Sequence, residues 1–150
     1  DRKKDLFVTS GGKNIAPSEL ERALTEDVYI DQAVVYGDGK NFITAMLVPN
    51  MQHLAPKLKE LGASMEMKGE FLVDPKLNGF LAERVNAVMA AFSKPERVKK
   101  FLVRQNPFTV ESDELTVSLK VRRRFVMKKY HAEFEALYQG PAPTDLAEDN

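Results

Sequence analysis

The sequence contains no cysteine and only two histidines among its 150 residues. Without cysteine the chain forms no disulfide, has no thiolate nucleophile and holds no metal through sulfur ligands. The histidines, His53 and His131, are too far apart in the sequence for a zinc-binding motif, and neither stands in an arrangement that implies catalysis. We therefore expect both to be surface residues, and we predict no metal site.

The chain also lacks an excess of charge of either sign and any long hydrophobic run. Lysine and arginine together number 22, aspartate and glutamate together number 22, and the formal net charge is zero. No electrostatic field of one sign therefore organises the molecule. No apolar run approaches the length that spans a membrane, and no signal peptide is visible. We expect a cytoplasmic protein, with peripheral contact to the inner face of a membrane left open.

The apolar fraction, 43%, is sufficient for a hydrophobic core, and the length is typical of one domain. Short apolar runs predict three strands. Apolar residues spaced three and four apart predict three helices, in addition to a helix near the start of the chain that is described below. The strands are expected at residues 32–36, 42–48 and 100–103, and these helices at residues 51–61, 75–92 and 121–137. We predict an α+β fold, in which a small three-stranded sheet is flanked by helices and preceded by an N-terminal two-stranded ribbon.

Other local signals mark the ends of these elements. Asn50 is expected to cap the second helix and Gly62 to end it. Residues 63–76 show no clear period, and residues 139–150 are expected to form a disordered acidic tail. In the closing helix the aromatic and apolar residues are expected to face inward, namely Phe125, Val126, Tyr130, Phe134 and Tyr138.

The start of the chain combines a strand, a glycine turn and a second strand. Residues 6–8 form a short apolar run, Gly11 and Gly12 permit a tight turn, and residues 13–15 can pair back on the first run. A helix then begins at Pro17, because proline fits the first helical position, where its missing N–H has no helical partner to lose.

Ser18 and Glu21 have the spacing of a capping box at the start of this helix. Leu20, Ala23 and Leu24 follow at helical spacing and predict one buried side.

Residues 1–24, in this order, resemble the hinge motif of the adenylate-forming enzymes, which include the acyl- and aryl-CoA synthetases. The resemblance rests on Arg2, Lys4 and the Thr-Ser-Gly-Gly-Lys-Asn core at residues 9–14, all in register. It is closest to the version found in long-chain fatty acyl-CoA synthetases. It implies that residues 1–138 form the C-terminal cap domain of such an enzyme.

A second stretch, residues 114–124, resembles the other motif of this cap, Leu-Thr-x-x-x-Lys-x-x-Arg, whose lysine is catalytic for adenylation. By register that lysine is Lys120, and a compact ammonium on a long stem suits the stabilisation of charge on a phosphate. Val117 stands where many members have proline, and Leu119 where many have glycine. Considered without the resemblance, Lys120 could equally be one of several solvated cations at the start of a surface helix.

The resemblance also implies roles for residues of the hinge motif. They are Arg2 on the ribose of AMP or ATP, Lys4 as the hinge, and Ser10, Gly11, Gly12 and Lys13 on the side of the pantetheine arm of CoA. Glycine suits the last role because a bare backbone lets a ligand pass closely.

The implied enzyme is a long-chain fatty acid–CoA ligase, an acid–thiol ligase that uses ATP and CoA, with a fatty acid as the other substrate. Its large N-terminal adenylation domain carries a glycine-rich phosphate loop, which this sequence lacks. We therefore expect that domain to be absent from this chain and to be its partner, and the chain alone to be inactive. Mg²⁺ would enter with ATP and find its ligands in the partner domain.

An alternative comes from residues 94–129, which are rich in lysine and arginine interleaved with aromatic residues. Such a stretch can bind nucleic acid or an anionic membrane surface. We rank nucleic-acid binding low, because the aromatic residues fall on the predicted core side and no known RNA- or DNA-binding signature is present.

Overall fold

The computed structural model describes residues 6–139, and at its centre lies a three-stranded sheet. The strands are β3 (Ile30–Tyr36), β4 (Ile43–Pro49) and β7 (Val98–Val103), in the order β3-β4-β7. β3 and β4 are antiparallel, whereas β4 and β7 are parallel. Every residue of the central strand β4 is buried, which explains why its sequence does not alternate between apolar and polar residues. The predicted strands are confirmed, although β7 begins at Val98 rather than at Lys100.

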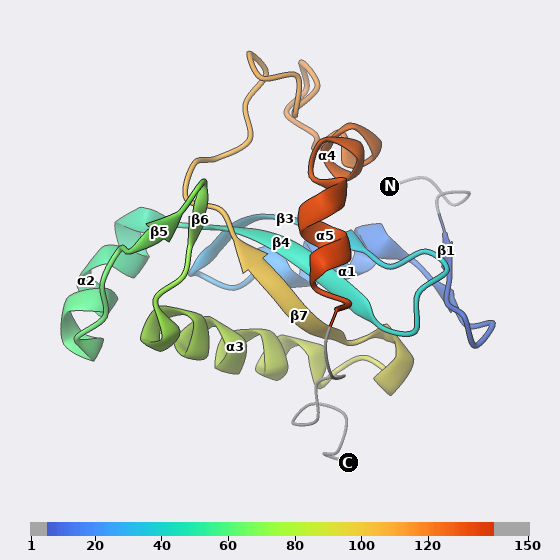
Figure 1. Ribbon diagram of the computed structural model, residues 1–150, viewed down its shortest axis with the longest axis horizontal. Coiled ribbons are helices and arrows are strands. Elements are labelled where there is room, and N and C mark those ends of the chain that lie inside the picture. The colour runs from blue at the N-terminus through green and yellow to red at the C-terminus, as the bar shows by residue number, and fades with distance from the viewer. Residues whose placement is uncertain (1–5, 140–150) are drawn as a thin grey trace.

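Helices cover both faces of this sheet (Figure 1). α1 (Pro17–Thr25) and α3 (Pro75–Met89) pack on one face, and α4 (Arg123–Lys129) and α5 (His131–Ala136) pack on the other. Neighbouring residues of β3 point to opposite faces, because side chains alternate along a strand: Val35 joins the core under α1 and α3, and Val34 joins the core under α4 and α5. The sheet therefore separates two hydrophobic cores.

The chain passes from β4 to β7 through α2 (Met51–Leu61), the hairpin of β5 (Met67–Lys68) and β6 (Phe71–Leu72), and α3. A parallel strand pair needs a long crossover, because the chain must return to the same end of the sheet. Leucines of α2, β6 and α3 form a third core beside β7. The sequence analysis did not predict this hairpin, because residues 63–76 show no clear period.

Helix α2 begins and ends where the sequence predicts. The side chain of Asn50 accepts hydrogen bonds from the backbone N–H groups of Gln52 and His53. Gly62 ends the helix with a φ of 69°, a left-handed conformation that glycine adopts with little strain. Asp74 caps α3 in the same way as Asn50 caps α2.

The predicted ends of two other helices are wrong. α3 ends at Met89, short of Phe92. The closing segment forms two helices instead of one, because the backbone at Tyr130 leaves the helical region with φ −108° and ψ 26°. The break lets α5 lie along the sheet at a different angle from α4 (Figure 1).

Most of the closing segment faces inward as predicted. Val126, Tyr130 and Phe134 are buried, and the half-buried Tyr138 donates a hydrogen bond of 2.7 Å to the backbone carbonyl of Phe42. Phe125 is the exception, since it belongs to none of the three cores and lies half-buried beneath the guanidinium of Arg122, 5.0 Å from its ring centre.

The capping box predicted at the start of α1 is also wrong. Ala16 occupies the N-cap position, no side chain caps the helix, and Pro17 takes the first helical position as predicted. Glu21 turns instead toward α4, where it has a different role described below.

Three predictions lie outside the described residues. Arg2 and Lys4 precede them, and the acidic tail follows them except for Gln139. Within residues 6–139, no helix is both long and apolar enough to span a bilayer.

Candidate functional site

The first predicted loop is a hairpin loop between β1 (Phe7–Val8) and β2 (Asn14–Ile15), which pair antiparallel as expected. The backbone N–H of Thr9 donates to the carbonyl of Lys13 (2.9 Å), and the N–H of Lys13 donates to the Thr9 hydroxyl (3.1 Å). The N–H of Gly12 closes the turn on the Thr9 carbonyl (2.9 Å), with φ at +87°. Ser10, Gly11, Gly12 and Lys13 are all exposed on this loop.

Residues 116–120, within the second motif, form a second hairpin loop that is built in the same way. The N–H of Thr116 donates to the carbonyl of Lys120 (2.8 Å), and the N–H of Lys120 donates to the Thr116 hydroxyl (3.1 Å). The N–H of Leu119 donates to the Thr116 carbonyl (2.8 Å), and the φ of Leu119 is +65°. Each loop therefore begins with a threonine that bonds both backbone groups of a lysine, and each has its last loop residue in the left-handed region.

This geometry matches the three-residue hairpin loop, whose third residue normally has positive φ. The geometry also shows what the family's proline and glycine would contribute at positions 117 and 119, the two positions at which the second motif of this chain departs from the family pattern. A proline at position 117 would preset φ at the start of the turn, and a glycine at position 119 would adopt positive φ with little strain. Val117 and Leu119 perform neither task, and both side chains are largely exposed.

The third loop position offers a pair of opposite predictions for stability. Gly12→Ala should lower the free energy of unfolding by about 1 kcal/mol, because a Cβ disfavours positive φ. The cost is conformational rather than steric, since a Cβ at Gly12 would meet no atom within 4 Å. Leu119→Gly should raise the free energy of unfolding by up to about 1 kcal/mol by releasing the same strain.

Urea denaturation of the unsubstituted chain, Gly12→Ala and Leu119→Gly measures both changes in the free energy of unfolding. Gly11→Ala is the matched control, because Gly11 does not have positive φ, and it should shift stability by less than about 0.5 kcal/mol. Equal losses at Gly11 and Gly12 would contradict the account of the loop.

Lys120 lies exposed at the end of the second loop and lines a groove of about 1150 Å³. The groove runs between α1, the start of β3 and residues 119–125, and it is rich in charge of both signs. None of the residues of the loop Thr9–Lys13 line it. The structure thus places Lys120 beside α1, and it places the glycine loop at a separate surface.

A clamp of three groups, the side chains of Arg123 and Glu21 and the N–H of Val35, fixes the start of α4, directly after the second hairpin, against α1 and β3. Arg123 donates from Nε to Oε2 of Glu21 (2.8 Å) and from Nη2 to Oε1 (2.7 Å), and both side chains are mostly buried. Oε2 of Glu21 also accepts the backbone N–H of Val35 (2.9 Å) on β3. Since β3 is an edge strand, Glu21 covers one of its unpaired N–H groups. Sequence reasoning missed this role, because Glu21 and Arg123 are far apart in the chain.

The glycine loop is fixed to the connection between β3 and β4. The N–H of Val8 donates to the carboxylate of Asp38 (2.9 Å), the N–H of Gly39 donates to the Val8 carbonyl (2.8 Å), and the N–H of Ser10 donates to the Lys40 carbonyl (3.0 Å). The side chain of Lys40 then pairs with Glu135 of α5 at 2.6 Å. Hydrogen bonds from Lys40 and then from Tyr36 lower the pKa of Glu135, so this carboxylate stays ionised at neutral pH.

The chain belongs to the family described as AMP-binding enzyme C-terminal domain, which it matches over residues 4–142. It is 37% identical over 141 residues to the long-chain-fatty-acid–CoA ligase FadD15 of Mycobacterium tuberculosis, covering 91% of this chain and 23% of the ligase. It is 30% identical to long chain acyl-CoA synthetase 1 of Arabidopsis thaliana, covering 93% of this chain and 21% of that protein. The chain therefore spans less than a quarter of the length of these relatives.

Solved structures share the fold. The adenylation domain of a carboxylate reductase from Mycobacterium chelonae superposes with a TM-score of 0.77 at 27% identity, covering 93% of this chain and 20% of that chain. The didomain of a carboxylic acid reductase from Segniliparus rugosus, solved in complex with AMP, superposes with a TM-score of 0.72 at 25% identity, covering 92% of this chain and 18% of that chain. The predicted family and fold class are confirmed.

The alternative of a nucleic-acid surface finds no support in these relatives. Phe108 and Tyr130, two aromatic residues of the basic stretch, are buried and so offer no stacking surface to bases.

Proposed function

We propose that this chain is the mobile C-terminal domain of a long-chain fatty acid–CoA ligase, which acts on a cleft of a partner adenylation domain. The observation that carries the proposal is the pair of like-built loops, one ending in Lys120 and one containing Gly11 and Gly12, at separate places on one domain. Membership of the family and the identity of 37% to a ligase that acts on long-chain fatty acids support the choice of substrate.

The first reaction joins the fatty acid to AMP. A carboxylate oxygen of the fatty acid attacks the α-phosphorus of ATP, the bond from that phosphorus to the bridging oxygen breaks, and pyrophosphate leaves. Mg²⁺, if bound with ATP by the partner domain, would neutralise part of the phosphate charge. Two anions must approach each other, and negative charge grows on the oxygens of the α-phosphate. The ammonium of Lys120, carried on an exposed loop, would enter the cleft and stabilise this charge.

The second reaction transfers the acyl group. The domain rotates, the thiolate of CoA attacks the acyl carbonyl carbon, the carbon–oxygen bond to AMP breaks, and AMP leaves as the anion. In this pose the glycine loop would line the path of the pantetheine arm. Four of the N–H groups of residues 9–13, those of Thr9, Ser10, Gly12 and Lys13, are bonded within the domain. The loop therefore contributes close approach of its bare backbone more than hydrogen-bond donors.

The test joins the 150-residue chain to the adenylation domain of the Mycobacterium tuberculosis ligase, in place of that enzyme's own C-terminal domain. Pyrophosphate release reports the first reaction, and acyl-CoA formation from supplied acyl-AMP reports the second. We expect both rates to rise well above those of the adenylation domain alone with a long-chain fatty acid. A folded chimera that accelerates neither reaction would refute the proposal.

A further inference from the structure

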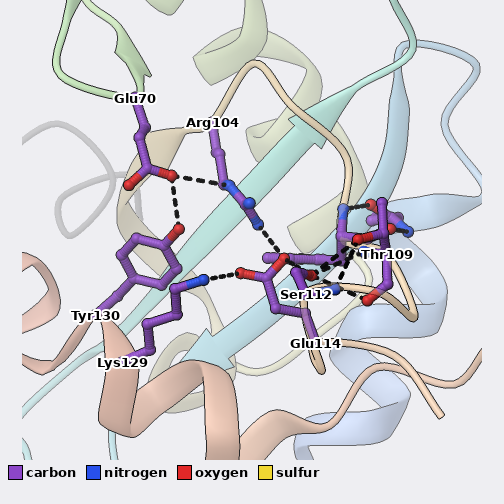
Figure 2. A network of polar contacts seen from close by, with 9 residues as sticks. Glu70, Arg104, Thr109, Ser112, Glu114, Lys129 and Tyr130 are labelled. Carbon is purple, nitrogen blue, oxygen red and sulfur yellow. Dashed lines mark hydrogen bonds and ion pairs between the residues drawn. The ribbon is translucent and has the colours of Figure 1, made fainter.

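The carboxylate of Glu114 is fully buried and carries three hydrogen bonds. Oε1 accepts from Nη1 of Arg104 (2.9 Å) and from the hydroxyl of Ser112 (2.7 Å), and Oε2 accepts from Nζ of Lys129 (2.9 Å). Figure 2 shows these groups converging on the carboxylate from three sides. Such a site is unusual, because a buried charge is stable only when it is paired and hydrogen-bonded.

The three donors belong to different parts of the domain. Arg104 follows β7, and its backbone N–H donates to the Leu47 carbonyl of β4 (2.8 Å). Lys129 is the last residue of α4, and Ser112 belongs to the loop that precedes Glu114. The carboxylate therefore links the sheet, the helix and the loop at one point.

A second layer orients Arg104. Oε1 of Glu70, on the β5–β6 hairpin, accepts the hydroxyl of Tyr130 (2.7 Å) and lies 3.5 Å from Nε of Arg104 (Figure 2). The guanidinium also lies 4.8 Å from the ring centre of Phe108 and 5.5 Å from that of Tyr130. Arg104 is held on several sides, so it presents one fixed face to Glu114.

Glu114 also stands at the base of the hairpin that carries Lys120. Its backbone carbonyl accepts the N–H of Arg122 (2.8 Å), and Leu115 then bridges to Val121. Above this stem lies the loop that ends in Lys120. Glu114 holds the first arm of the stem through its own side chain, and it holds the helix that follows the second arm through Lys129.

The energetics favour a geometric role for this network. Burial alone would raise the pKa of Glu114, but the hydrogen bonds from Lys129, Ser112 and Arg104 outweigh it and leave the pKa below its ordinary value. The carboxylate is therefore ionised at neutral pH. A buried ionic network adds little stability compared with well-packed apolar side chains, because desolvation offsets the attraction between charges. Its distinct property is that it enforces one arrangement of the segments it joins.

We propose that Glu114 is a positioning residue for adenylation: through Arg104, Lys129 and Ser112 it sets the direction in which the hairpin presents Lys120. This inference rests on the proposed function. Displacement of a reacting group by about 1 Å can lower a rate by two orders of magnitude. The loop Thr9–Lys13 is held by other hydrogen bonds, with Asp38, Gly39 and Lys40. We therefore expect its position not to depend on Glu114.

The test is Glu114→Gln in the ligase formed by this chain and its adenylation domain, with the two reactions measured separately. Glutamine keeps the shape of the side chain but removes the charge that Arg104 and Lys129 share. We expect acyl-AMP formation to fall about 10- to 100-fold, while transfer from supplied acyl-AMP changes less than about 2-fold. Ser112→Ala, which removes one donor and keeps both ion pairs, should reduce the first reaction alone and by less.

Asp27→Asn is the matched control, because Asp27 is a buried carboxylate paired with Arg84 at 2.8 Å on the α1–α3 side of the sheet. It should leave the ratio of the two reactions unchanged. An equal fall of both reactions in Glu114→Gln, or the same ratio in Glu114→Gln and Asp27→Asn, would overturn the inference.

Two further readouts keep the outcomes distinct. Amide hydrogen exchange of residues 116–120 in the 150-residue chain should quicken in Ser112→Ala and not in Asp27→Asn. If Glu114→Gln fails to fold, an unchanged reaction ratio and unchanged exchange in Ser112→Ala refute the inference. If Lys120→Ala leaves acyl-AMP formation intact, the proposed function itself fails; if Lys120→Ala abolishes it and Glu114→Gln does not alter the ratio, only the positioning role fails.

Discussion

Replacing Lys120 with alanine should lower the rate of acyl-AMP formation by about 10²- to 10³-fold, the loss expected when one preorganised charge-stabilising group is removed. Lys120 is exposed at the end of its loop, so its ammonium can enter a cleft of another domain. Transfer of the acyl group from supplied acyl-AMP to CoA should change little, because in the proposed mechanism Lys120 has left the cleft by then.

Lys128→Ala is the control for this prediction. Lys128 is an exposed lysine of the neighbouring helix α4, so its removal changes the net charge by the same amount without touching the loop. Both reactions should keep their rates in this variant. Equal losses of the two reactions in Lys120→Ala, or a comparable loss in Lys128→Ala, would contradict the role assigned to Lys120.

Replacing Glu21 with alanine should lower the free energy of unfolding of this chain by about 2–4 kcal/mol. The substitution removes a bidentate ion pair that is largely shielded from solvent, with side-chain exposures of 16% for Glu21 and 13% for Arg123. It also leaves the backbone N–H of Val35, on an edge strand, without its carboxylate acceptor. Urea denaturation followed by circular dichroism measures the change.

Glu19→Ala is the matched control, since Glu19 is an exposed glutamate in the first turn of the same helix. Its loss should cost no more than about 0.5 kcal/mol, the scale of a charge interacting with the helix dipole. If the two variants are equally stable, the clamp between Glu21 and Arg123 contributes nothing and this reading of it is refuted.

The clamp has a consequence for the proposed rotation. Glu21 and Arg123 bind the hairpin of Lys120 to α1, while Asp38 and Lys40 bind the glycine loop to the β3–β4 connection. α1 and β3 pack closely on each other, so both loops belong to one unit. In the proposed mechanism, rotation of that unit about its hinge therefore exchanges the two loops without any change inside the domain.

The sequence by itself determined the features that depend on neighbouring residues. The central strand β4, both ends of α2 and the two loop motifs follow from local composition, because capping, turn geometry and apolar runs act over a few residues. Val117 and Leu119 were recognised as departures from the motif only through the resemblance to the family. The family could also be recognised from two short stretches, residues 1–24 and 114–124, and the family match confirms it.

Only the tertiary structure decided which charged residues meet. Glu21, which matches a capping box locally, binds Arg123 across 102 positions of the chain. Glu114 shows no pattern in the sequence that predicts burial, yet its carboxylate is buried and paired with Arg104 and Lys129. The physical reason is the same in both cases: a charged side chain carries no periodic signal, and its partner is chosen by the packing of sheet and helices, which brings distant segments to within hydrogen-bond distance.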